Sequence, residues 1–429
     1  MHLTQEEQDI LAGSQGEVMQ KVLRTIVAFG DVFGAERLIP IEGPIHFVNT
    51  TAMAGLDAVY AHLDEIIGAG IKTLQPFTVD PYPMDFVNIE TTEEQKKEFL
   101  RIYEPQDRYI EQLLKIGLKS MDDFSCACYL PQIGNIPKKG QIIAWAESSA
   151  VVYANSVLGA RTNRNSALIE LFCGIMGKVP EFGLLLDKNR KATWKIEVRT
   201  SEKPSATVLG SAVGRKVMED VPYITGLEKY LGTTQDGDTQ DYLKDLGAAA
   251  ASNGAVGLFH VEGVTPEALD LGEELLAEGY QTYVIDDQVL ADTVASYPVL
   301  WKDKKETPVL CLIGCPHLSL TQVQNWYHKI VDRLEKEGKE RLAVQTIFLT
   351  PPAVIKEFKK DEAAFERLTK AGVNLSNTCP IMYMTNPLCA ARPVVTCSNK
   401  ARTYSTARFY EDDDLLEVIV TGDPERRNA

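Results

Sequence analysis

The sequence predicts an α/β fold of several domains, in which parallel or mixed sheets are flanked by helices. Strands, loops and helices alternate from about residue 240 onward, as in folds built around a parallel sheet. The chain has 429 residues, 45% of them hydrophobic, which is enough for two or three domains. We expect an N-terminal α/β part over residues 1–203, a middle α/β part over 204–300 and a C-terminal α/β part over 301–429.

The N-terminal part is expected to open with helices. Thr4 followed by Glu7 is typical of a capping box, and apolar residues from Ile10 to Ile26 recur at helical spacing. Further along, periodicity and turn residues predict helices over 52–67, 93–116 and 148–157, and strands over 71–74 and 142–145, the first of which leads into a turn-rich loop at 76–81.

Beyond residue 240 the same signals predict strands that alternate with helices. The expected strands cover 255–260, 281–285, 308–313 and 342–349. The expected helices cover 240–252, 266–278, 288–296, 320–336 and 353–371. Because the carboxyl ends of parallel strands meet at one edge of a sheet, the loops after these strands are expected to carry the binding site.

Charge and apolar pattern exclude several classes of partner. Lys and Arg number 44 against 60 Asp and Glu, and the resulting net charge of -16 repels nucleic acid phosphates and anionic membranes. No segment reaches the roughly eighteen apolar residues of a membrane span, and the acidic start lacks the regions of a secretory signal. We therefore expect a cytoplasmic protein with neither nucleic acid nor membrane as its partner. Its eight cysteines are expected to be thiols or metal ligands.

Three cysteines far apart in the chain, Cys126, Cys315 and Cys379, lie where a strand is expected to end and a loop to begin. Because no Cys-x-x-Cys pair occurs, this arrangement indicates one metal cluster assembled from three loops. The alternative is that each thiol only fills core space. Three thiolates can hold three irons of a 4Fe-4S cluster and leave the fourth open, or can bind a smaller cluster. An open iron is a Lewis acid suited to the dehydration of a hydroxy acid.

One polar loop is the second candidate. Arg161, Thr162, Asn163 and Arg164 offer donors that could clamp a carboxylate, and Glu147 before them is available to handle a proton. The alternative is a capped surface loop in which Glu147 only pairs with an arginine.

Three histidines complete the candidates. His317 follows Cys315 and Pro316 after an apolar strand, and the proline there directs both side chains toward one site. His46 and His260 lie near strand ends, where a histidine is commonly a hydrogen-bonded structural residue.

Four motifs together resemble the large, catalytic subunit of aconitase X of the two-subunit type: residues 141–164, 263–268, 314–319 and 377–380. The resemblance extends from about residue 3 to residue 400. It implies an aconitase-like fold that lacks the swivel domain. It also implies that Cys126, Cys315 and Cys379 bind an iron-sulfur cluster, 4Fe-4S or 2Fe-2S.

The resemblance further implies a reaction and a partner. Members of the family dehydrate cis-3-hydroxy-L-proline, which gives 1-pyrroline-2-carboxylate and is our first expectation for this chain. The alternatives are mevalonate 5-phosphate or another hydroxy acid. A separate small subunit, formed by the swivel domain, is expected to supply a catalytic serine, and a small-molecule hydroxy acid is the expected substrate.

Residue roles follow as hypotheses. The expected catalytic residues, which orient the hydroxyl and a metal-bound water, are Glu147, His46, His260 and His317. The residues expected to bind the substrate carboxylate or phosphate are Arg161, Thr162, Asn163, Arg164, Ser398 and Lys400.

The chain departs from the family pattern at several positions. Cys128 replaces a proline and Cys397 lies beside Ser398, so each adds a thiol that is a further candidate for the metal site. Asp80 stands where the family has an asparagine. These departures leave the reaction type intact and the substrate open. A non-catalytic iron-sulfur sensor is the second alternative, although a sensor has no need of a carboxylate clamp.

Overall fold

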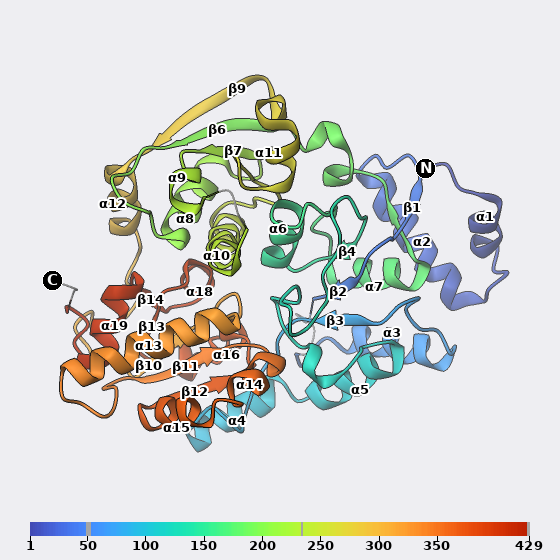
Figure 1. Ribbon diagram of the computed structural model, residues 1–429. Helices are drawn as coiled ribbons and strands as arrows, with labels where there is room; N and C mark the ends of the chain where they lie inside the picture. The colour runs from blue at the N-terminus through green and yellow to red at the C-terminus, as the bar shows by residue number, and fades with distance from the viewer. Residues whose placement is uncertain (49–52, 233–234, 427–429) are drawn as a thin grey trace.

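Three parallel sheets with helices packed around them form the described part of the protein, which comprises residues 1–48, 53–232 and 235–426 (Figure 1). In the computed structural model their strand orders are β3-β2-β4, β8-β7-β6-β9 and β12-β11-β10-β13-β14. A further pair of strands, β1-β5, is antiparallel. The predicted α/β class with parallel sheets flanked by helices is therefore confirmed. The division of the chain at residues 203 and 300 stays a prediction.

The first sheet carries His46 at its centre. β2 (Ile45–Phe47) is flanked by β3 (Phe77–Val79) and β4 (Ala144–Trp145), and His46 lies opposite Thr78 in the register. The other elements of this part are β1 (Leu38–Pro40), β5 (Lys178–Pro180), α1 (Gln5–Leu11), α2 (Glu17–Val32), α3 (Asp57–Gly68), α5 (Gln106–Ile116), α6 (Ser148–Ser156), α7 (Ala167–Met176) and the short 3-10 helices Met121–Asp123, Gly183–Leu185 and Asp187–Asn189.

The second sheet packs on two helices that cross closely. A Cβ on Gly210 of α8 would lie 2.2 Å from the carbonyl oxygen of Leu246 in α10, so only glycine permits this contact. α10 in turn contacts α6, α13 and α18, which places it at the centre of the molecule (Figure 1). The elements of this part are β6 (Ala192–Val198), β7 (Pro222–Thr225), β8 (His260–Val261), β9 (Leu276–Ile285), α8 (Ala206–Val217), α9 (Glu228–Leu231), α10 (Gly237–Asn253), α11 (Pro266–Leu271), α12 (Asp287–Ala295) and the 3-10 helix Gly272–Leu275.

The third sheet is built from the C-terminal part of the chain and is joined by α4 (Glu93–Ile102) from much earlier in the sequence (Figure 1). Phe99 of α4 lies in one apolar cluster with Leu312 and Ile347 of the sheet. The elements are β10 (Leu310–Ile313), β11 (Gln345–Leu349), β12 (Val373–Ser376), β13 (Val394–Thr396), β14 (Arg408–Phe409), α13 (Leu320–Lys336), α14 (Pro352–Phe358), α15 (Glu362–Lys370), α16 (Pro380–Tyr383), α17 (Pro387–Ala390), α18 (Asn399–Tyr404) and α19 (Asp412–Thr421).

Two predicted helices are each divided in the structure. The helix expected over 93–116 forms α4 and α5, because Pro105 has no N–H with which to continue the first. The helix expected over 353–371 forms α14 and α15, because the Asp361 carboxylate accepts from the Ala364 N–H at 3.0 Å and begins a new helix.

Other predicted boundaries also differ. The helix expected over 266–278 ends at Leu271, after which Gly272 has a φ of 52° and the chain turns toward β9. Of the strand expected over 255–260, only His260 is in β8, and the strand expected over 71–74 lies instead at β3. Residue 52, the expected start of a helix, lies outside the described residues, and α3 begins at Asp57.

The prediction of α13 over 320–336 is confirmed to the residue, and the capping box at Thr4 is present, since Thr4 Oγ1 accepts from the Glu7 N–H at 3.3 Å. Among the described residues, we find no helix with the length and apolar character needed to cross a lipid bilayer.

Candidate functional site

Three loops carry Cys126, Cys315 and Cys379, and the last two of them follow strands of the third sheet. The first runs beside β3, where the Ser125 N–H donates to the Val79 carbonyl at 2.7 Å. Cys315 follows β10, and Cys379 follows β12 and precedes α16 as its N-cap residue. All three are free thiols and half-buried. The predicted position after a strand is therefore confirmed for Cys315 and Cys379, whereas Cys126 follows the 3-10 helix Met121–Asp123 and a single bridge from Phe124 to Val79.

The His317 side chain connects the three loops. Its Nδ1 lies 3.2 Å from the Ser125 hydroxyl, and its Nε2 lies 3.3 Å from the Thr378 carbonyl oxygen. Its main-chain N–H donates to the Cys126 sulfur at 3.3 Å. Burial lowers the pKa of His317 to about 3, so its ring is neutral at neutral pH. The loops of all three cysteines therefore meet at one uncharged histidine.

The three thiols share one neighbouring cation. Burial raises the pKa of each thiol, to about 12 for Cys315 and to about 11 for Cys379, while the positive charge of Lys400 acts in the opposite direction on all three. Because a Coulomb interaction weakens with distance, a single lysine that acts on Cys126, Cys315 and Cys379 indicates a common centre. Without a metal the three groups are neutral thiols.

Glu147 and Lys400 form a buried ion pair beside these thiols. Lys400 Nζ donates to Glu147 Oε1 and, at 3.2 Å, to the Ser149 hydroxyl. Glu147 also caps α6, where its Oε2 accepts from the Ala150 N–H and the Ser149 hydroxyl, both at 2.6 Å. Burial alone would raise the pKa of Glu147, but Lys400 and these donors outweigh it and lower the pKa. Both groups are therefore charged.

His46 and Asp80 form a second pair close to the first. His46 Nδ1 lies 2.9 Å from the Thr78 hydroxyl, and its Nε2 lies 3.4 Å from Asp80 Oδ1. Burial alone would lower the pKa of His46, but the Cys128 thiol and Asp80 outweigh it and raise the pKa to about 10. Burial, with the Glu147 charge, raises the pKa of Asp80. Both raised pKa values mean that each group tends to hold a proton. We place one proton on His46, at the Nε2 that faces the Asp80 carboxylate.

Ser398 fixes the Cys315 loop against the helix that carries Lys400. Its hydroxyl donates to the Cys315 carbonyl and accepts from the Ala401 N–H at 3.1 Å, which makes Ser398 the N-cap of α18. The proton of this hydroxyl is therefore held by the main chain.

Arg161 and His260 lie in a different cluster. The centre of that cluster is Arg190, which is 2% exposed and donates to both carboxylate oxygens of Glu267 at 2.7 and 3.0 Å. Arg161 pairs with Asp187 at 2.5 Å, and His260 Nε2 lies 2.8 Å from the Arg190 carbonyl oxygen. Burial lowers the pKa of His260, so this ring is neutral as well.

The helix α6 separates the two clusters. Glu147 at its start belongs to the thiol site, whereas Asn155 near its end accepts from Arg190 Nη1 at 3.2 Å. At 1.5 Å of rise per residue these two positions lie about 12 Å apart. The structure therefore brings the cysteines together with Glu147, His46, His317, Ser398 and Lys400 and does not bring Arg161 or His260 to them.

Two of the remaining residues of the predicted carboxylate clamp form hydrogen bonds within their own part of the fold. The Thr162 N–H donates to Asn155 Oδ1 at 3.0 Å, and Asn163 Nδ2 donates to the Phe182 carbonyl at 3.0 Å. Arg164 is exposed and forms no ion pair within the described residues. The loop has two charged residues, Arg161 and Arg164. Arg161 is paired, so in the described part of the chain Arg164 is the one that is left open to a ligand.

Several residues of these clusters are absent from the sequence-based candidates. Asp80 carries a usable signal, because it follows a buried strand and precedes a proline. Arg190 carries none, because Glu267, with which it pairs, lies far away in the sequence. Tyr129 is also unexpected. Its ring stacks on Tyr153 with centroids 3.7 Å apart, and its buried hydroxyl has no hydrogen-bond partner among the described residues.

The donor set fits an iron-sulfur cluster. Three free thiols in converging loops are the ligand type that such clusters take, and the hydroxyl of Tyr129, which has no hydrogen-bond partner among the described residues, lies within electrostatic reach of Cys126. In the described ranges no three or more His, Cys, Asp or Glu side chains gather closely enough to hold one metal ion. A cluster of several irons, unlike a single ion, holds its ligands around a larger centre.

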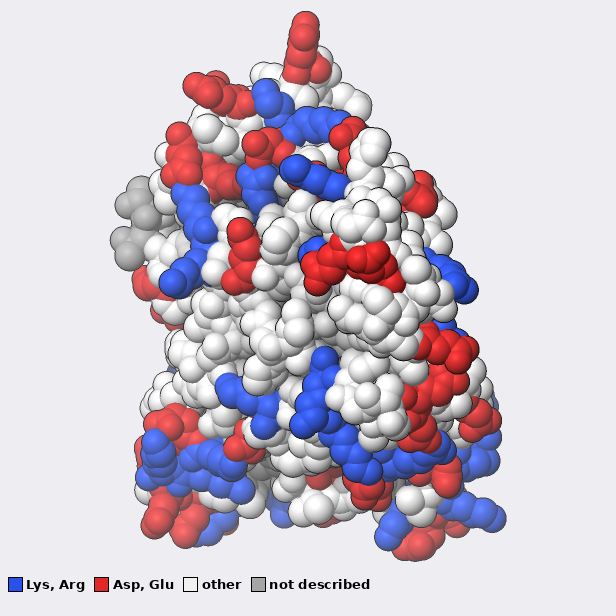
Figure 2. Space-filling model, turned by 90° about the vertical axis from the view of Figure 1, so that its right-hand side faces the viewer, with Lys and Arg blue, Asp and Glu red and all other residues white. Residues whose placement is uncertain are grey.

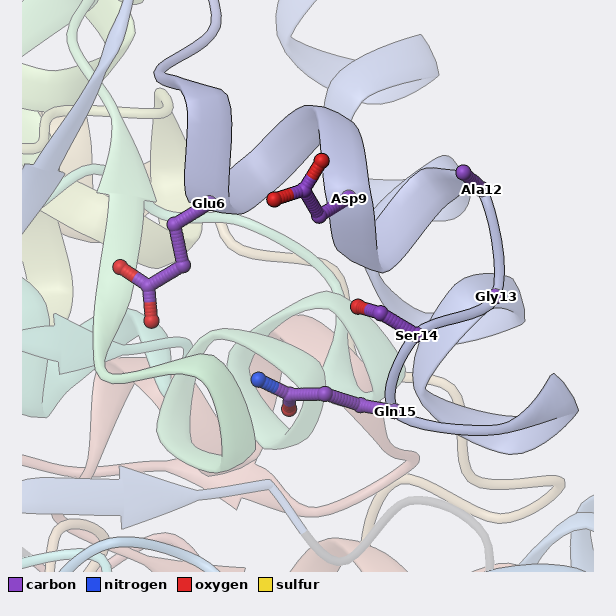
Figure 3. Close-up of a pocket in the computed structure, with 6 residues that line it drawn as sticks. All are labelled: Glu6, Asp9, Ala12, Gly13, Ser14 and Gln15. Atoms are coloured by element: carbon purple, nitrogen blue, oxygen red, sulfur yellow. The ribbon is translucent and has the colours of Figure 1, made fainter.

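The surface hollow beside α1 has a different chemistry (Figure 3). It has a volume of about 610 Å³ and is lined by Glu6, Asp9, Ala12, Gly13, Ser14 and Gln15. None of the candidate residues lies in it. On the face shown in Figure 2, acidic and basic side chains are interspersed, which is not the continuous basic surface that nucleic acid requires.

Sequence comparisons relate the chain to known proteins. The aconitase X first domain matches residues 1–188, and the aconitase X second domain matches residues 191–295. The phosphomevalonate dehydratase large subunit of Thermococcus kodakarensis is 36% identical over 347 residues, which cover 79% of this chain and 78% of that protein. That of Methanocaldococcus jannaschii is 31% identical over 436 residues, covering 97% of this chain and 100% of that protein. The cis-3-hydroxy-L-proline dehydratase of Pseudomonas aeruginosa is 33% identical over 272 residues, 62% of this chain and 43% of that protein.

A solved structure has the same architecture. The crystal structure of Thermococcus kodakaraensis aconitase X in its holo-form matches with a TM-score of 0.79 and 32% sequence identity, and the match covers 98% of this chain and 100% of that chain.

Proposed function

Because the chain belongs to the aconitase X family, we propose that it is the large subunit of a two-subunit dehydratase that acts on a small hydroxy acid. The observation that carries this proposal is the convergence of three cysteine loops around the Glu147–Lys400 ion pair. Thiols that can ligate iron, next to a cation that can bind a carboxylate, are the groups that dehydration of a hydroxy acid needs. A non-catalytic sensor has no use for the cation.

Cys126, Cys315 and Cys379 are the residues that would hold the cluster. When bound, an iron-sulfur cluster with an incompletely coordinated iron supplies Lewis acidity that favours loss of a hydroxyl group. The thiols must lose their protons to become ligands, and the main-chain N–H of His317 stabilises the Cys126 sulfur in that form.

The other residues of the site bind the substrate and move a proton. Lys400 binds the substrate carboxylate, and Glu147 keeps the lysine oriented from the opposite side. His46 holds a proton at Nε2, facing Asp80, whose side chain is 15% exposed and is the member of the pair that reaches the substrate. This pair donates the proton to the departing hydroxyl.

We infer that the base for the proton on the neighbouring carbon comes from outside these residues. Glu147 is a weak base, because Lys400 and the donors of α6 lower its pKa. Relatives of the chain are named as large subunits. We therefore infer a separate small swivel-domain subunit that completes the site with a catalytic serine.

The comparisons favour mevalonate 5-phosphate as the substrate. The chain spans 78% of the Thermococcus kodakarensis phosphomevalonate dehydratase large subunit and the whole of the Methanocaldococcus jannaschii one. cis-3-Hydroxy-L-proline, the substrate expected from the motifs, is the second candidate, because the Pseudomonas aeruginosa enzyme is 33% identical over the matched residues.

A turnover assay tests the proposal. The chain is purified without oxygen together with its small subunit, loaded with iron and sulfide, and incubated with either substrate, and loss of one water is followed by mass spectrometry. Dehydration of mevalonate 5-phosphate supports the first assignment, and dehydration of cis-3-hydroxy-L-proline alone assigns the second. A fully loaded complex that dehydrates neither overturns the dehydratase proposal in favour of a sensor. The Lys400→Met variant is the control, because it should lose turnover and keep the visible absorption of the cluster.

A further inference from the structure

We propose that His317 is a positioning residue that holds the three cysteine loops together, so that the three sulfurs are in place before a cluster is bound. This inference rests on the proposed function, because it takes Cys126, Cys315 and Cys379 as the ligands. It assigns His317 a role different from the catalytic one expected from the sequence.

Each hydrogen bond of the ring ends beside one of the cysteines. Ser125, which faces Nδ1 at 3.2 Å, directly precedes Cys126. Thr378, whose carbonyl oxygen faces Nε2 at 3.3 Å, directly precedes Cys379. His317 itself lies two residues after Cys315, so one ring joins all three loops.

The hydrogen-bond partners fix the form of the ring. A carbonyl oxygen can only accept, so the Nε2 that faces Thr378 carries the proton. Nδ1 is then the acceptor for the Ser125 hydroxyl, which in turn accepts from the Ala127 N–H at 3.0 Å. Both nitrogens of this fully buried ring are therefore in use, and neither is free to exchange a proton with a substrate.

The main chain of His317 is held as firmly as its ring. Its N–H donates to the Cys126 sulfur at 3.3 Å, and its carbonyl accepts from Lys244 Nζ at 3.1 Å. Lys244 is 1% exposed and is paired with Asp241 at 3.6 Å and Asp245 at 3.8 Å, all on α10. The central helix therefore anchors the histidine, and the histidine anchors the loops.

This arrangement explains how three separate loops can retain a cluster. Without such a connection each loop would be free to move when no metal is bound, and ordering it would oppose binding by the lost backbone entropy. Residues behind the ligands that fix their orientation typically change metal affinity by about ten- to a hundredfold when they are replaced. We expect His317 to act on cluster retention in this way.

The test uses the full chain with His317→Gln, which keeps a donor toward Thr378 and loses the acceptor for Ser125, and His317→Leu, which loses both. Ser125→Ala removes the same contact from the other side and keeps the chain testable if a buried leucine prevents folding. His260→Gln is the matched control. It alters a histidine that is equally buried and also faces a main-chain carbonyl, that of Arg190 at 2.8 Å, in the other cluster.

The first readout is the rate at which a chelator removes iron from the loaded chain. We expect His317→Gln and Ser125→Ala to lose iron about tenfold faster than the unmodified chain and His317→Leu about a hundredfold faster, with His260→Gln within about twofold. Folded His317 variants that release iron at the unmodified rate would overturn the inference.

The second readout needs no metal. In the metal-free chain, we expect iodoacetamide to modify Cys126 and Cys379 several times faster in the His317 and Ser125 variants than in the unmodified chain and in His260→Gln. Equal rates would overturn the inference. If the unmodified chain takes up no iron, the proposed function fails, and the alkylation rates still decide whether His317 positions the loops.

Discussion

Lys400 donates a hydrogen bond to Glu147 across a sequence separation of 253 residues. The pair joins the first turn of α18 to the N-cap of α6, and the three cysteine loops lie around it. A residue expected to bind substrate and one expected to handle a proton are thus two halves of one ion pair. Their charges depend on each other, and so do their roles.

The coupling of this pair can be measured by a double-mutant cycle. Glu147→Gln leaves a buried ammonium without its carboxylate, and Lys400→Met leaves the carboxylate without its cation, so each should lower the free energy of unfolding by about 3 kcal/mol. The double variant should lose less than the sum, by at least about 1 kcal/mol, because no unpaired charge remains. Urea unfolding of the four chains gives these values, and strict additivity would contradict the pairing.

Arg190→Lys tests the separation of the two clusters. A lysine cannot make the two parallel bonds to Glu267 that the guanidinium makes, so we expect the free energy of unfolding to fall by about 3 kcal/mol. Because about 12 Å of α6 separates Arg190 from the thiol site, the iron content should stay unchanged. If the variant remained folded and lost iron, the assignment of Arg190 to a cluster separate from the thiol site would be wrong.

Asp245 should make stability depend on pH. Burial raises its pKa to about 6 in the folded chain, above the unfolded value of about 3.9. The stability that this carboxyl contributes is therefore fully present below about pH 4 and is lost as the pH rises through about 6. We expect the loss between these limits to be about 1 kcal/mol, since the side chain is 27% exposed and partly screened by water.

Asp245→Asn is the comparison, because the amide does not titrate. Urea unfolding of both chains at about pH 4 and about pH 7 should show a smaller fall in stability for the variant than for the unmodified chain. The same pH dependence in both would show that Asp245 has an ordinary pKa.

Local patterns in the sequence predict much of this fold. The regular helical spacing of apolar residues and the Ser319 cap predict both ends of α13 correctly. The unbroken apolar run before Cys315 predicts the strand there. Boundaries fail where one residue interrupts a longer pattern. Pro105 and Asp361 each divide a helix whose apolar period continues beyond them.

The candidate site is predictable only in part. The three cysteines can be selected because the sequence pattern places each at the start of a loop, and the structure places these loops together, although Cys126 follows a 3-10 helix and not the expected strand. The ion pair of Glu147 with Lys400 cannot be read from the sequence, because it depends on how α6 and α18 pack. For the same reason the sequence assigns Arg161 to the site, whereas the fold places it with Arg190 and Asp187.

The two additional thiols near the site should not hold iron. Cys128 is fully buried and lies beside His46, and the half-buried Cys397 has Asp412, Cys311 and Asp245 as its electrostatic neighbours. We expect Cys128→Ala and Cys397→Ala each to retain the iron and sulfide content of the unmodified chain. A loss of iron in either variant would add that cysteine to the ligand set.

The most direct test of the central claim, that three loops supply one cluster, is the iron and acid-labile sulfide content of the reconstituted chain. Cys126→Ser, Cys315→Ser and Cys379→Ser should each lose nearly all of both, because every ligand is needed to keep the cluster. Cys173→Ser, a buried thiol of α7 outside the site, should retain the unmodified content. Full iron and sulfide in any of the first three variants, or equal loss in the fourth, would contradict the account.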